Sequence, residues 1–523
     1  MPSLLVDEPL TANSHGTQHT PHRAARGALI AALFTPLVLL LHGYHPYTED
    51  GGLYLAEVKW LLNRALYPAY TDFVTQHLHF SIFPWLMADF TRLSHQPLDW
   101  VVLEFYVLST WLTLWSIWML AGRVVRTLQG RIGAVLLLAC WWSIPVAGTS
   151  LMLMDPYVTA RSFSTPLILL ALTMFLVFLN RHDAAGERKR AAILGCVALL
   201  AAILIHPLMA GFGAATLLLL FVFARTTGRR RAAILVTLTV AVLALCSALY
   251  AHTPPASASE RLAAASRYYW FLSGWQWFEL LGIVGPMIVL LLLNRRRATD
   301  PGEGLLIRAL LALNIIAVVV CLCFPRDGMA NFGVQSMQPM RSLHLLYLGM
   351  ILLLGAWLGE VCLVQRTWRW CLAAVVLGSP MVYVARATTP ASAHLEMPWR
   401  VPENPWVQTF LWIRTNTPED AVFAMDPHYI TLDTEDAQGF RALAERSSMP
   451  DYSKDGGEAG DTMSLADRWL AAVNAQASID SESDEKRRAL GLAYGATWLL
   501  LKVDSATSLA CPYANSLVKV CRL

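Results

Sequence analysis

Residues 191–224 read AAILGCVALLAAILIHPLMAGFGAATLLLLFVFA, and this stretch decides the fold class. A helix needs about 20 mostly apolar residues to cross the hydrocarbon core of a bilayer, so the stretch is too long for one span. His206-Pro207 divides it into 191–207 and 208–224, because proline interrupts a helix. The pattern therefore predicts two membrane helices joined in a tight hairpin.

Long apolar runs of this kind recur throughout residues 27–386. Only 15% of the 523 residues are charged, whereas a soluble domain carries about 25%. Eleven segments qualify as spans: 27–44, 100–121, 132–152, 163–180, 191–207, 208–224, 232–251, 278–294, 305–324, 342–362 and 369–386. We therefore expect a mainly α, polytopic membrane helix bundle over 27–386, preceded by a disordered tail at 1–26.

Basic residues indicate how this bundle is oriented. Short cytoplasmic loops of membrane proteins carry an excess of Lys and Arg. With eleven spans, every basic loop falls on one side, and the alternate loops are poorer in these residues. The residues concerned are Arg123, Arg126, Arg131, Arg181, Arg188, Lys189, Arg190, Arg225, Arg229, Arg230, Arg231, Arg295, Arg296, Arg297, Arg366 and Arg369. We therefore expect a cytoplasmic N-terminus and, since the count is odd, a periplasmic C-terminal domain.

Residues 387–523 have the composition of a soluble domain. Helical spacing is found at 404–416, 464–476 and 484–495, strand-like runs at 421–427, 439–447, 496–503 and 516–523, and a polar loop at 450–462. This alternation predicts a small α/β domain built on a layered sheet. The net charge of +3, without a basic tract, argues against nucleic acid as a partner.

Two cysteines, Cys511 and Cys521, close the chain. Cysteines in an extracytoplasmic domain can form a disulfide, whereas the alternative is two free thiols. The predicted topology favours the disulfide.

The first outer loop, residues 45–99, begins with the acidic pair Glu49 and Asp50. The run that follows, GGLYLAEVKWLLNR, places apolar residues on one helix face and Lys59 and Arg64 on the other. This pattern predicts an amphipathic helix lying on the membrane surface.

Further ionisable residues lie at the predicted outer edge of the membrane. Asp155 and Arg161 belong to the loop at 151–166, and His206 lies at the tip of the hairpin. Arg326 and Arg341 flank two neighbouring spans. The outer edge therefore carries the candidate chemistry.

The layout resembles the GT-C superfamily of membrane glycosyltransferases, which combine about a dozen spans, acidic outer loops and often a soluble domain. FLWIRTNTPEDAVFAMDPHY at 410–429 is similar to the start of such domains in oligosaccharyltransferase-like members. EDGGLY (49–54), DPYVTARSFSTP (155–166) and GFRALAERS (439–447) look like features of uncharacterised bacterial proteins of this type. MDPHY (425–429) stands where those members carry a Trp-Trp-Asp-Tyr-Gly acceptor motif, which puts acceptor recognition of that kind in doubt.

The resemblance implies transfer of a sugar from a polyprenyl-phosphate-linked donor at the outer face of a bacterial cytoplasmic membrane. The acceptor, which is a glycan, a lipid or a protein of the cell envelope, must lose a proton, and a carboxylate can act as general base. Asp50 is the first candidate for this base and Glu49 the second; otherwise they are solvated acids at a helix N-terminus. Asp155 would bind a metal or orient the acceptor; otherwise it is a turn residue before proline. A divalent cation cofactor is left open.

The leaving phosphate needs cations, and the guanidinium fork suits it. Arg161, Arg326 and Arg341 are candidates, with His206 as a further substrate-binding residue. Their alternative roles are contacts with lipid headgroups for the arginines and an ordinary helix end for the histidine. We expect Asp50, Asp155 and Arg341 to line one cavity if the site exists.

Two other classes of function remain open. A non-catalytic relative of the same fold would bind a lipid-linked saccharide or serve envelope assembly. A transporter should show internal repeats or charged residues near the bilayer midplane, and the sequence has neither.

Overall fold

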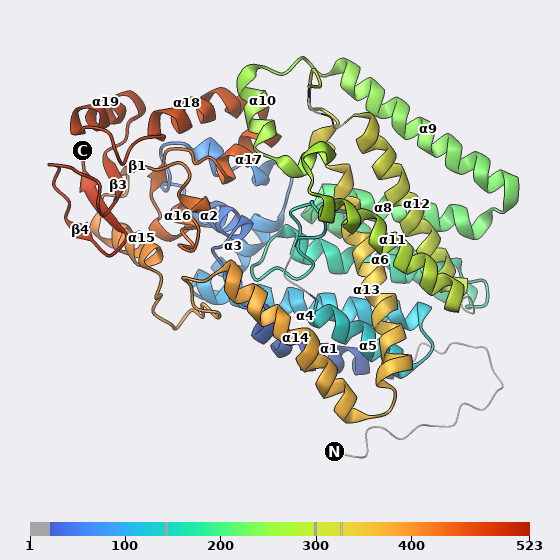
Figure 1. Ribbon diagram of the computed structural model, residues 1–523. Coiled ribbons are helices and arrows are strands. Elements are labelled where there is room, and N and C mark those ends of the chain that lie inside the picture. Colours follow the sequence, from blue (N-terminus) through green and yellow to red (C-terminus); the bar gives the residue numbers. More distant parts are fainter. Residues whose placement is uncertain (1–20, 142–144, 298–300, 325, 327) are drawn as a thin grey trace.

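The computed structural model describes residues 21–141, 145–297, 301–324, 326 and 328–523 (Figure 1). Most of the predicted tail at 1–26, namely residues 1–20, lies outside this description. Residues 21–26 form the beginning of the first helix, α1 (Pro21–His42).

Helices stand at all eleven positions where the sequence predicts spans. Besides α1 they are α4 (Leu98–Val124), α5 (Leu128–Ala139), α6 (Ala160–Leu179), α7 (Ala185–Ile205), α8 (Pro207–Arg225), α9 (Gly228–His252), α11 (Trp277–Arg297), α12 (Pro301–Cys323), α13 (Leu343–Trp357, extended by η7, Leu358–Leu363) and α14 (Thr367–Thr388). Within the described residues, nine helices are long and apolar enough to cross a membrane. The chain is a multi-pass membrane protein.

Two of the eleven helices, α5 and α7, are not both long and apolar enough to cross a membrane. α5 has 12 residues, about 18 Å at 1.5 Å per residue, and ends well before the predicted limit of 152. Part of that predicted span, residues 142–144, lies outside the description. α7 has 21 residues, but its first turns carry Glu187, Arg188, Lys189 and Arg190. The hydropathy of the sequence therefore predicted the positions of these two helices correctly, but not the length of their apolar part.

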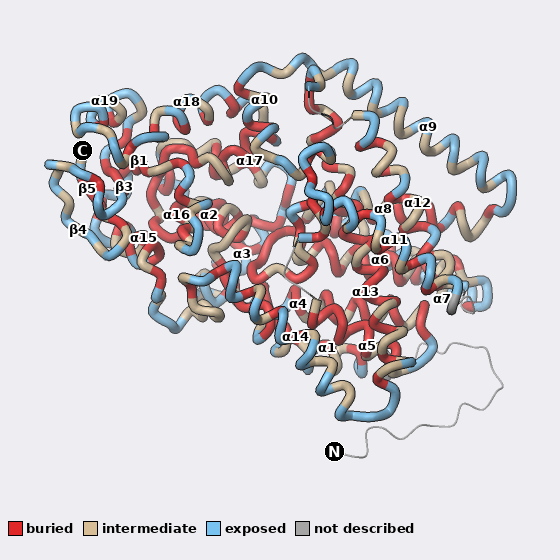
Figure 2. Tube along the Cα trace, viewed as in Figure 1, coloured by how far each residue is buried: buried red, intermediate tan, exposed pale blue. Residues whose placement is uncertain are grey.

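Close packing of α5 against α13 depends on glycine. A Cβ added to Gly133 would lie 2.2 Å from the carbonyl oxygen of Gly355, and one added to Gly359 would lie 2.2 Å from that of Gln129. Gly355 and Gly359 are four residues apart, the spacing that lets two membrane helices approach at backbone distance. By contrast, α9 has no buried residue and lies at the edge of the bundle (Figure 2).

Short elements between the membrane helices meet the C-terminal part of the chain, and we call this region the junction. It comprises α2 (Asp50–Leu62), η1 (Thr71–Phe73), η2 (His77–His79), α3 (Phe83–Ser94), α10 (Ala258–Ala265), η3 (Tyr268–Trp270), η4 (Leu272–Gly274), η5 (Gln335–Met337) and η6 (Pro339–Ser342).

Helix α2 does not lie on the membrane surface as predicted. It packs between α3 and α16 (Phe440–Ala444), and both Glu57 and Lys59 on its supposed polar face are buried. Lys59 Nζ lies 2.8 Å from a carboxylate oxygen of Glu445. The apolar pattern correctly predicted a helix. Both faces of α2 are nevertheless covered by other parts of the protein, not by lipid on one face and water on the other.

The C-terminal unit is a five-stranded sheet with helices, in the strand order β2-β1-β3-β5-β4. β1 is parallel to β2 and β3, whereas β3–β5 and β5–β4 are antiparallel. The elements are α15 (Pro405–Asn416), β1 (Val422–Met425), η8 (Tyr429–Thr431), α16, β2 (Ser447–Ser448), α17 (Lys454–Asp461), η9 (Met463–Leu465), α18 (Ala466–Gln476), α19 (Asp484–Tyr494), β3 (Trp498–Lys502), β4 (Tyr513–Ala514) and β5 (Val518–Arg522).

Side chains alternate across the central strand β3, as a strand buried on both faces requires. Trp498 and Leu500 pack with α15 and α16, whereas Leu499 and Leu501 join the core formed with α18. Two predictions were wrong here: 439–447 begins with helix α16, and the supposed polar loop 450–462 contains helix α17. The mainly helical membrane bundle with a small α/β unit is confirmed.

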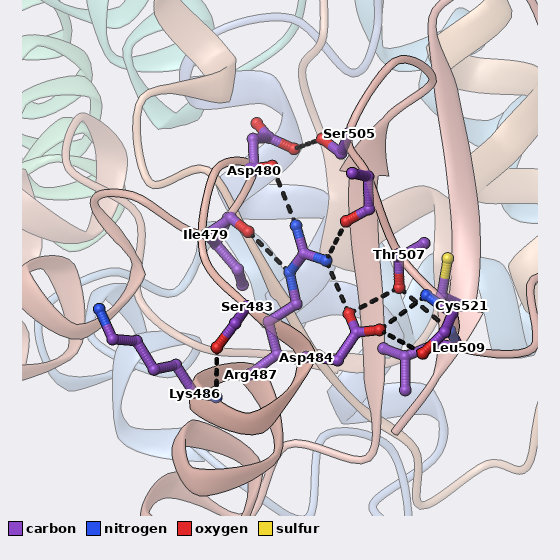
Figure 3. A network of polar contacts seen from close by, with 12 residues as sticks. Ile479, Asp480, Ser483, Asp484, Lys486, Arg487, Ser505, Thr507, Leu509 and Cys521 are labelled. Atoms are coloured by element: carbon purple, nitrogen blue, oxygen red, sulfur yellow. Dashed lines mark hydrogen bonds and ion pairs between the residues drawn. The ribbon is translucent and has the colours of Figure 1, made fainter.

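Arg487, on α19, forms a hydrogen-bond network in the C-terminal unit (Figure 3). Its buried guanidinium donates to the carbonyl oxygens of Ile479, Asp480 and Ala506 at 2.8–2.9 Å, and to Asp484 at 2.8 Å. Four hydrogen bonds on one cation tie α19 to the segment before it and to the loop after β3. Nearby, Cys511 and Cys521 form a disulfide bond.

Candidate functional site

The acidic pair after α1 is engaged by a lysine from the far end of the chain. Lys454, at the start of α17, contacts the carboxylate of Glu49, and its Nζ lies 3.2 Å from Oδ1 of Asp50. Glu49 has a φ of 51° and a ψ of −130°, an unfavourable backbone conformation for a residue with a side chain. Its backbone N–H donates to the side chain of Gln438. The C-terminal unit thus holds both acids in place.

Burial alone would favour the neutral form of Asp50. The positive charges of Lys454, Arg161 and Arg341 outweigh this effect and hold the pKa of Asp50 well below its usual range. Asp50 is therefore a carboxylate at neutral pH. Its side chain remains 44% exposed, whereas that of Lys454 is 14% exposed.

A second pair, Asp155 and Arg161, lies beside the first. Nη2 of Arg161 donates to both carboxylate oxygens of Asp155 at 2.8 and 2.9 Å, and both side chains are buried. Burial raises the pKa of Asp155, against the effect of Arg161, and the charges of Asp50 and Glu49 raise it further. Nε of Arg161 is buried and has no hydrogen-bond partner in the described part of the chain.

Arg341, in η6, approaches the same acids from another element. Its guanidinium lies 5.6 Å from the ring centre of Tyr269, and its charge acts on Asp50. Its Nε is also buried without a hydrogen-bond partner among the residues described. An unmet guanidinium N–H in a buried place is costly, so a ligand that reached either group would gain a favourable hydrogen bond.

His206 forms the tip of the α7–α8 hairpin and lies close enough to Arg341, Arg161 and His77 to interact with their charges. The junction holds this tip directly: Ser81 Oγ donates to the carbonyl oxygen of Ile205 at 2.6 Å. The structure thus brings His206 to the cluster from a hairpin of membrane helices.

Sequence reasoning missed a buried cluster next to these residues. His77 Nδ1 lies 3.4 Å from a carboxylate oxygen of Glu57 and 3.7 Å from one of Glu458 on α17. Burial works against the charge of His77, but Glu458 and Glu57 raise its pKa to about 10. Burial raises the pKa of Glu458 to about 8.

The other residues that were missed also come from α17 or contact it. Burial raises the pKa of Asp461, against the effects of Arg341 and Arg267. Arg267 donates to the carbonyl oxygen of Ser453, just before α17. The run KDGGEAGD (454–461) has no apolar periodicity, so its sequence gave no sign of a helix inserted among ionisable groups. Arg267 stands in an aromatic run that is also typical of a membrane interface.

Arg326 lies away from this cluster. It is exposed, and its guanidinium donates to the carbonyl oxygen of Leu322 at the end of the preceding helix, α12. This arginine satisfies a free helix end, which is an ordinary structural role.

The predicted common cavity is divided in the structure. Asp155 and Arg161 line a cavity of about 30 Å³ that includes His344, whereas Arg341 lines another of about 10 Å³ beside Tyr269. Asp50 lines neither of them. The residues are joined by their charges rather than by one open space. No group of three His, Cys, Asp or Glu residues suited to a metal ion occurs among the described residues.

No protein-family model and no curated protein sequence matches the chain. The archaeal oligosaccharyltransferase AglB from Archaeoglobus fulgidus, solved with an inhibitory peptide and a dolichol-phosphate, has a TM-score of 0.50 and 12% identity, and the match covers 92% of this chain and 69% of that chain. ArnT from Cupriavidus metallidurans, bound to undecaprenyl phosphate, has a TM-score of 0.41 and 13% identity over 95% and 98% of the two chains. The match to AglB spans most of this chain and shows that the two proteins share a fold, as the resemblance found in the sequence implies.

Proposed function

We propose that the protein is a membrane glycosyltransferase that moves a sugar from a polyprenyl-phosphate-linked donor to an acceptor at the outer face of a bacterial cytoplasmic membrane. The observation that carries the proposal is the buried Nε of Arg341, which has no partner among the described residues and belongs to a guanidinium acting on Asp50. A cation with an unmet donor that acts on the charge of a carboxylate provides an anion site and a base near one another.

The phosphate of the donor binds to Arg341 and to the free edge of Arg161. A guanidinium suits this role because it stays charged and offers N–H groups in a planar fork. Asp155 holds Arg161 in position through the contacts of Nη2 at 2.8 and 2.9 Å. Structural neighbours of this fold were solved with dolichol-phosphate and with undecaprenyl phosphate, which supports a lipid phosphate as the ligand.

Asp50 acts as the general base, with Glu49 as the second candidate. The acceptor hydroxyl attacks the anomeric carbon, the bond from that carbon to the phosphate oxygen breaks, and the polyprenyl phosphate leaves. The hydroxyl proton passes to the carboxylate of Asp50, which is ionised and partly exposed. In this proposal the N-terminus is cytoplasmic and residues 387–523 form a periplasmic domain, so that the acids face the outer leaflet.

Binding of undecaprenyl phosphate to the detergent-purified full chain tests the anion site, with undecaprenol as the matched lipid without phosphate. We expect saturable binding of the phosphate alone. Arg341→Gln should weaken it about 10–100-fold, since a hydrogen bond to a charged group contributes about 1.5–3 kcal/mol. Arg326→Gln serves as the control and should leave binding unchanged. Equal binding of undecaprenol, or no effect of Arg341→Gln, would contradict the proposal.

A second candidate, a non-catalytic binding protein of the same fold, is favoured by one observation: Lys454 occupies the carboxylate of Asp50. The two candidates differ in their response to Asp50→Asn, an isosteric change that removes the base. A transferase loses sugar transfer from the lipid donor and keeps lipid phosphate binding. A binding protein shows no transfer in either form.

A further inference from the structure

A further cavity, separate from the anion site, lies where several parts of the chain meet. We call it the junction cavity, and it measures about 190 Å³. It is lined by the segment after α1, the first turn of α4, the linker between α14 and α15, one face of α15, the segment before α16 and α16 itself. Its lining includes Tyr44, Tyr47, Asp99, Glu396, Arg414 and Asp436.

Tyr44 lines this cavity, and its hydroxyl is buried. Its side chain is only 1% exposed, and the hydroxyl has no hydrogen-bond partner among the described residues. Its ring is fixed by Tyr106, with 5.0 Å between the ring centres, and its backbone N–H donates to the carbonyl oxygen of His394. A buried hydroxyl without a partner is costly, so a ligand that reached it would gain a favourable hydrogen bond.

The carboxylates of the cavity are fixed but keep capacity for a ligand. Oδ1 of Asp99 accepts from Tyr47, Oε2 of Glu396 contacts His45 at 3.0 Å, and Oδ2 of Asp436 accepts a backbone N–H at 2.8 Å. Each contact uses one oxygen, so the second oxygen of each carboxylate can accept from a donor in the cavity. The side chains are therefore oriented in advance.

The charges of the lining select the class of ligand. The lining contains the carboxylates of Asp99, Glu396, Glu403 and Asp436 and the guanidinium groups of Arg400 and Arg414. This excess of negative charge disfavours an anion such as a phosphate. The combination of hydrogen-bond acceptors, two guanidinium donors and tyrosine rings suits a ligand that is rich in hydroxyl groups and has apolar ring faces.

The size of the cavity agrees with such a ligand. A water molecule takes about 30 Å³ of liquid volume, so the cavity holds the equivalent of roughly six waters, about one sugar ring. Trp100 and Trp399, which adjoin the lining residues Asp99 and Arg400 in the sequence, have their ring centres 5.3 Å apart, and both are exposed.

We propose that the junction cavity is a binding subsite for one saccharide unit of the acceptor, with the Tyr44 hydroxyl as the group that completes its recognition. The term acceptor rests on the proposed transferase function, whereas saccharide binding itself does not. The acceptor would thus be recognised by a cavity that the C-terminal unit and the first outer segment build together, next to the acidic pair in the sequence.

Saturation-transfer NMR on the detergent-purified full chain tests this proposal, with methyl β-glucopyranoside, methyl β-galactopyranoside, glucosamine and glucose 1-phosphate as probes. We expect saturable binding of at least one of the first three and weaker binding of glucose 1-phosphate. Tyr44→Phe, which removes only the hydroxyl, should weaken binding about 2–10-fold, as expected for one hydrogen bond. Tyr383→Phe on the exposed face of α14 is the matched control.

A second variant keeps the test decisive if Tyr44→Phe perturbs the fold. Ala393→Leu fills the junction cavity from the linker and should abolish saccharide binding while undecaprenyl phosphate binding persists. Absence of binding by all probes, binding indifferent to Ala393→Leu, or preference for glucose 1-phosphate would overturn the proposal. Since no donor is needed, saccharide binding without any sugar transfer would reject the transferase function and leave the subsite standing.

Discussion

Replacing Lys454 with methionine should make Asp50 harder to ionise. The two charged atoms are 3.2 Å apart, and unit charges at this distance attract by about 5 kcal/mol at an effective dielectric constant of about 20. That value is a ceiling, because solvent reaches the 44% exposed side chain of Asp50 and screens the pair. A nearby opposite charge lowers a carboxyl pKa by about 1–3 units, and the exposure of Asp50 places it at the lower end.

Arg161 and Arg341 keep their effect on Asp50 in the Lys454→Met variant. We therefore expect the pKa of Asp50 to rise by about one unit, which corresponds to about 1.4 kcal/mol. A base works only in its ionised form, so a higher pKa moves the loss of activity at acidic pH to a higher pH.

The assay is the pH dependence of kcat/KM for sugar transfer, because its acidic limb reports the ionisation of the base in the free enzyme. The limb should move up by about one pH unit in Lys454→Met and stay in place in Lys486→Met, where the exposed lysine lies on α19. An unchanged limb would refute the role of Lys454 in setting the charge of Asp50. A limb that moves to lower pH would refute the sign of the interaction.

Four further predictions concern stability. Since the pKa of His77 is raised to about 10 from about 6.5 in an unfolded chain, its contribution is full below about pH 6.5 and is lost as the pH rises to 10. The melting temperature should fall less over this interval in His77→Gln than in the wild type; an equal fall would contradict the assignment. Arg487→Met leaves three carbonyl groups and Asp484 without their cation and should cost about 3–5 kcal/mol, measured as protease resistance of the C-terminal unit, while Lys486→Met stays within about 0.5 kcal/mol. The double variant Cys511→Ser and Cys521→Ser should lose about 3 kcal/mol by the same measurement, because the cysteines are 10 residues apart, and reductant should affect only the wild type. Gly355→Leu should lower the yield of folded protein, since even its Cβ would meet the carbonyl oxygen of Gly133 at 2.5 Å, whereas Gly285→Leu, with open space around it, should not.

The membrane architecture was predictable because each span is encoded locally. The 34 residues at 191–224 contain both the apolar length and the proline that separates α7 from α8. Strand β3 was predictable for the same reason, since a short run of apolar residues is typical of a buried strand. α17 was not, because its helix is stabilised by tertiary contacts: Asp455 binds the guanidinium of Arg441 at 2.6 and 2.8 Å.

The candidate site was predictable only in part. Asp50, Asp155, Arg161 and Arg341 stood out as charged residues at the ends of apolar runs, and the structure brings them within reach of one another's charge. The sequence did not indicate which residues contact these charged groups. Lys454 lies in a segment whose sequence resembles any polar loop, and a sequence does not show that its ammonium group meets an acid at the other end of the chain. The sequence likewise does not show that acidic, basic and aromatic residues from distant segments together line the junction cavity.

The ion pair between Asp50 and Lys454 joins residues 404 positions apart in the chain. Ribosomes add about 5–20 residues per second, so roughly 20–80 s pass between the synthesis of the acid and that of its partner. During that time Glu49 and Asp50 stand beside the membrane without their lysine. The contact therefore forms only on chains that have been synthesised at least as far as α17, and a chain terminated before α17 lacks the charge of Lys454 beside its acids.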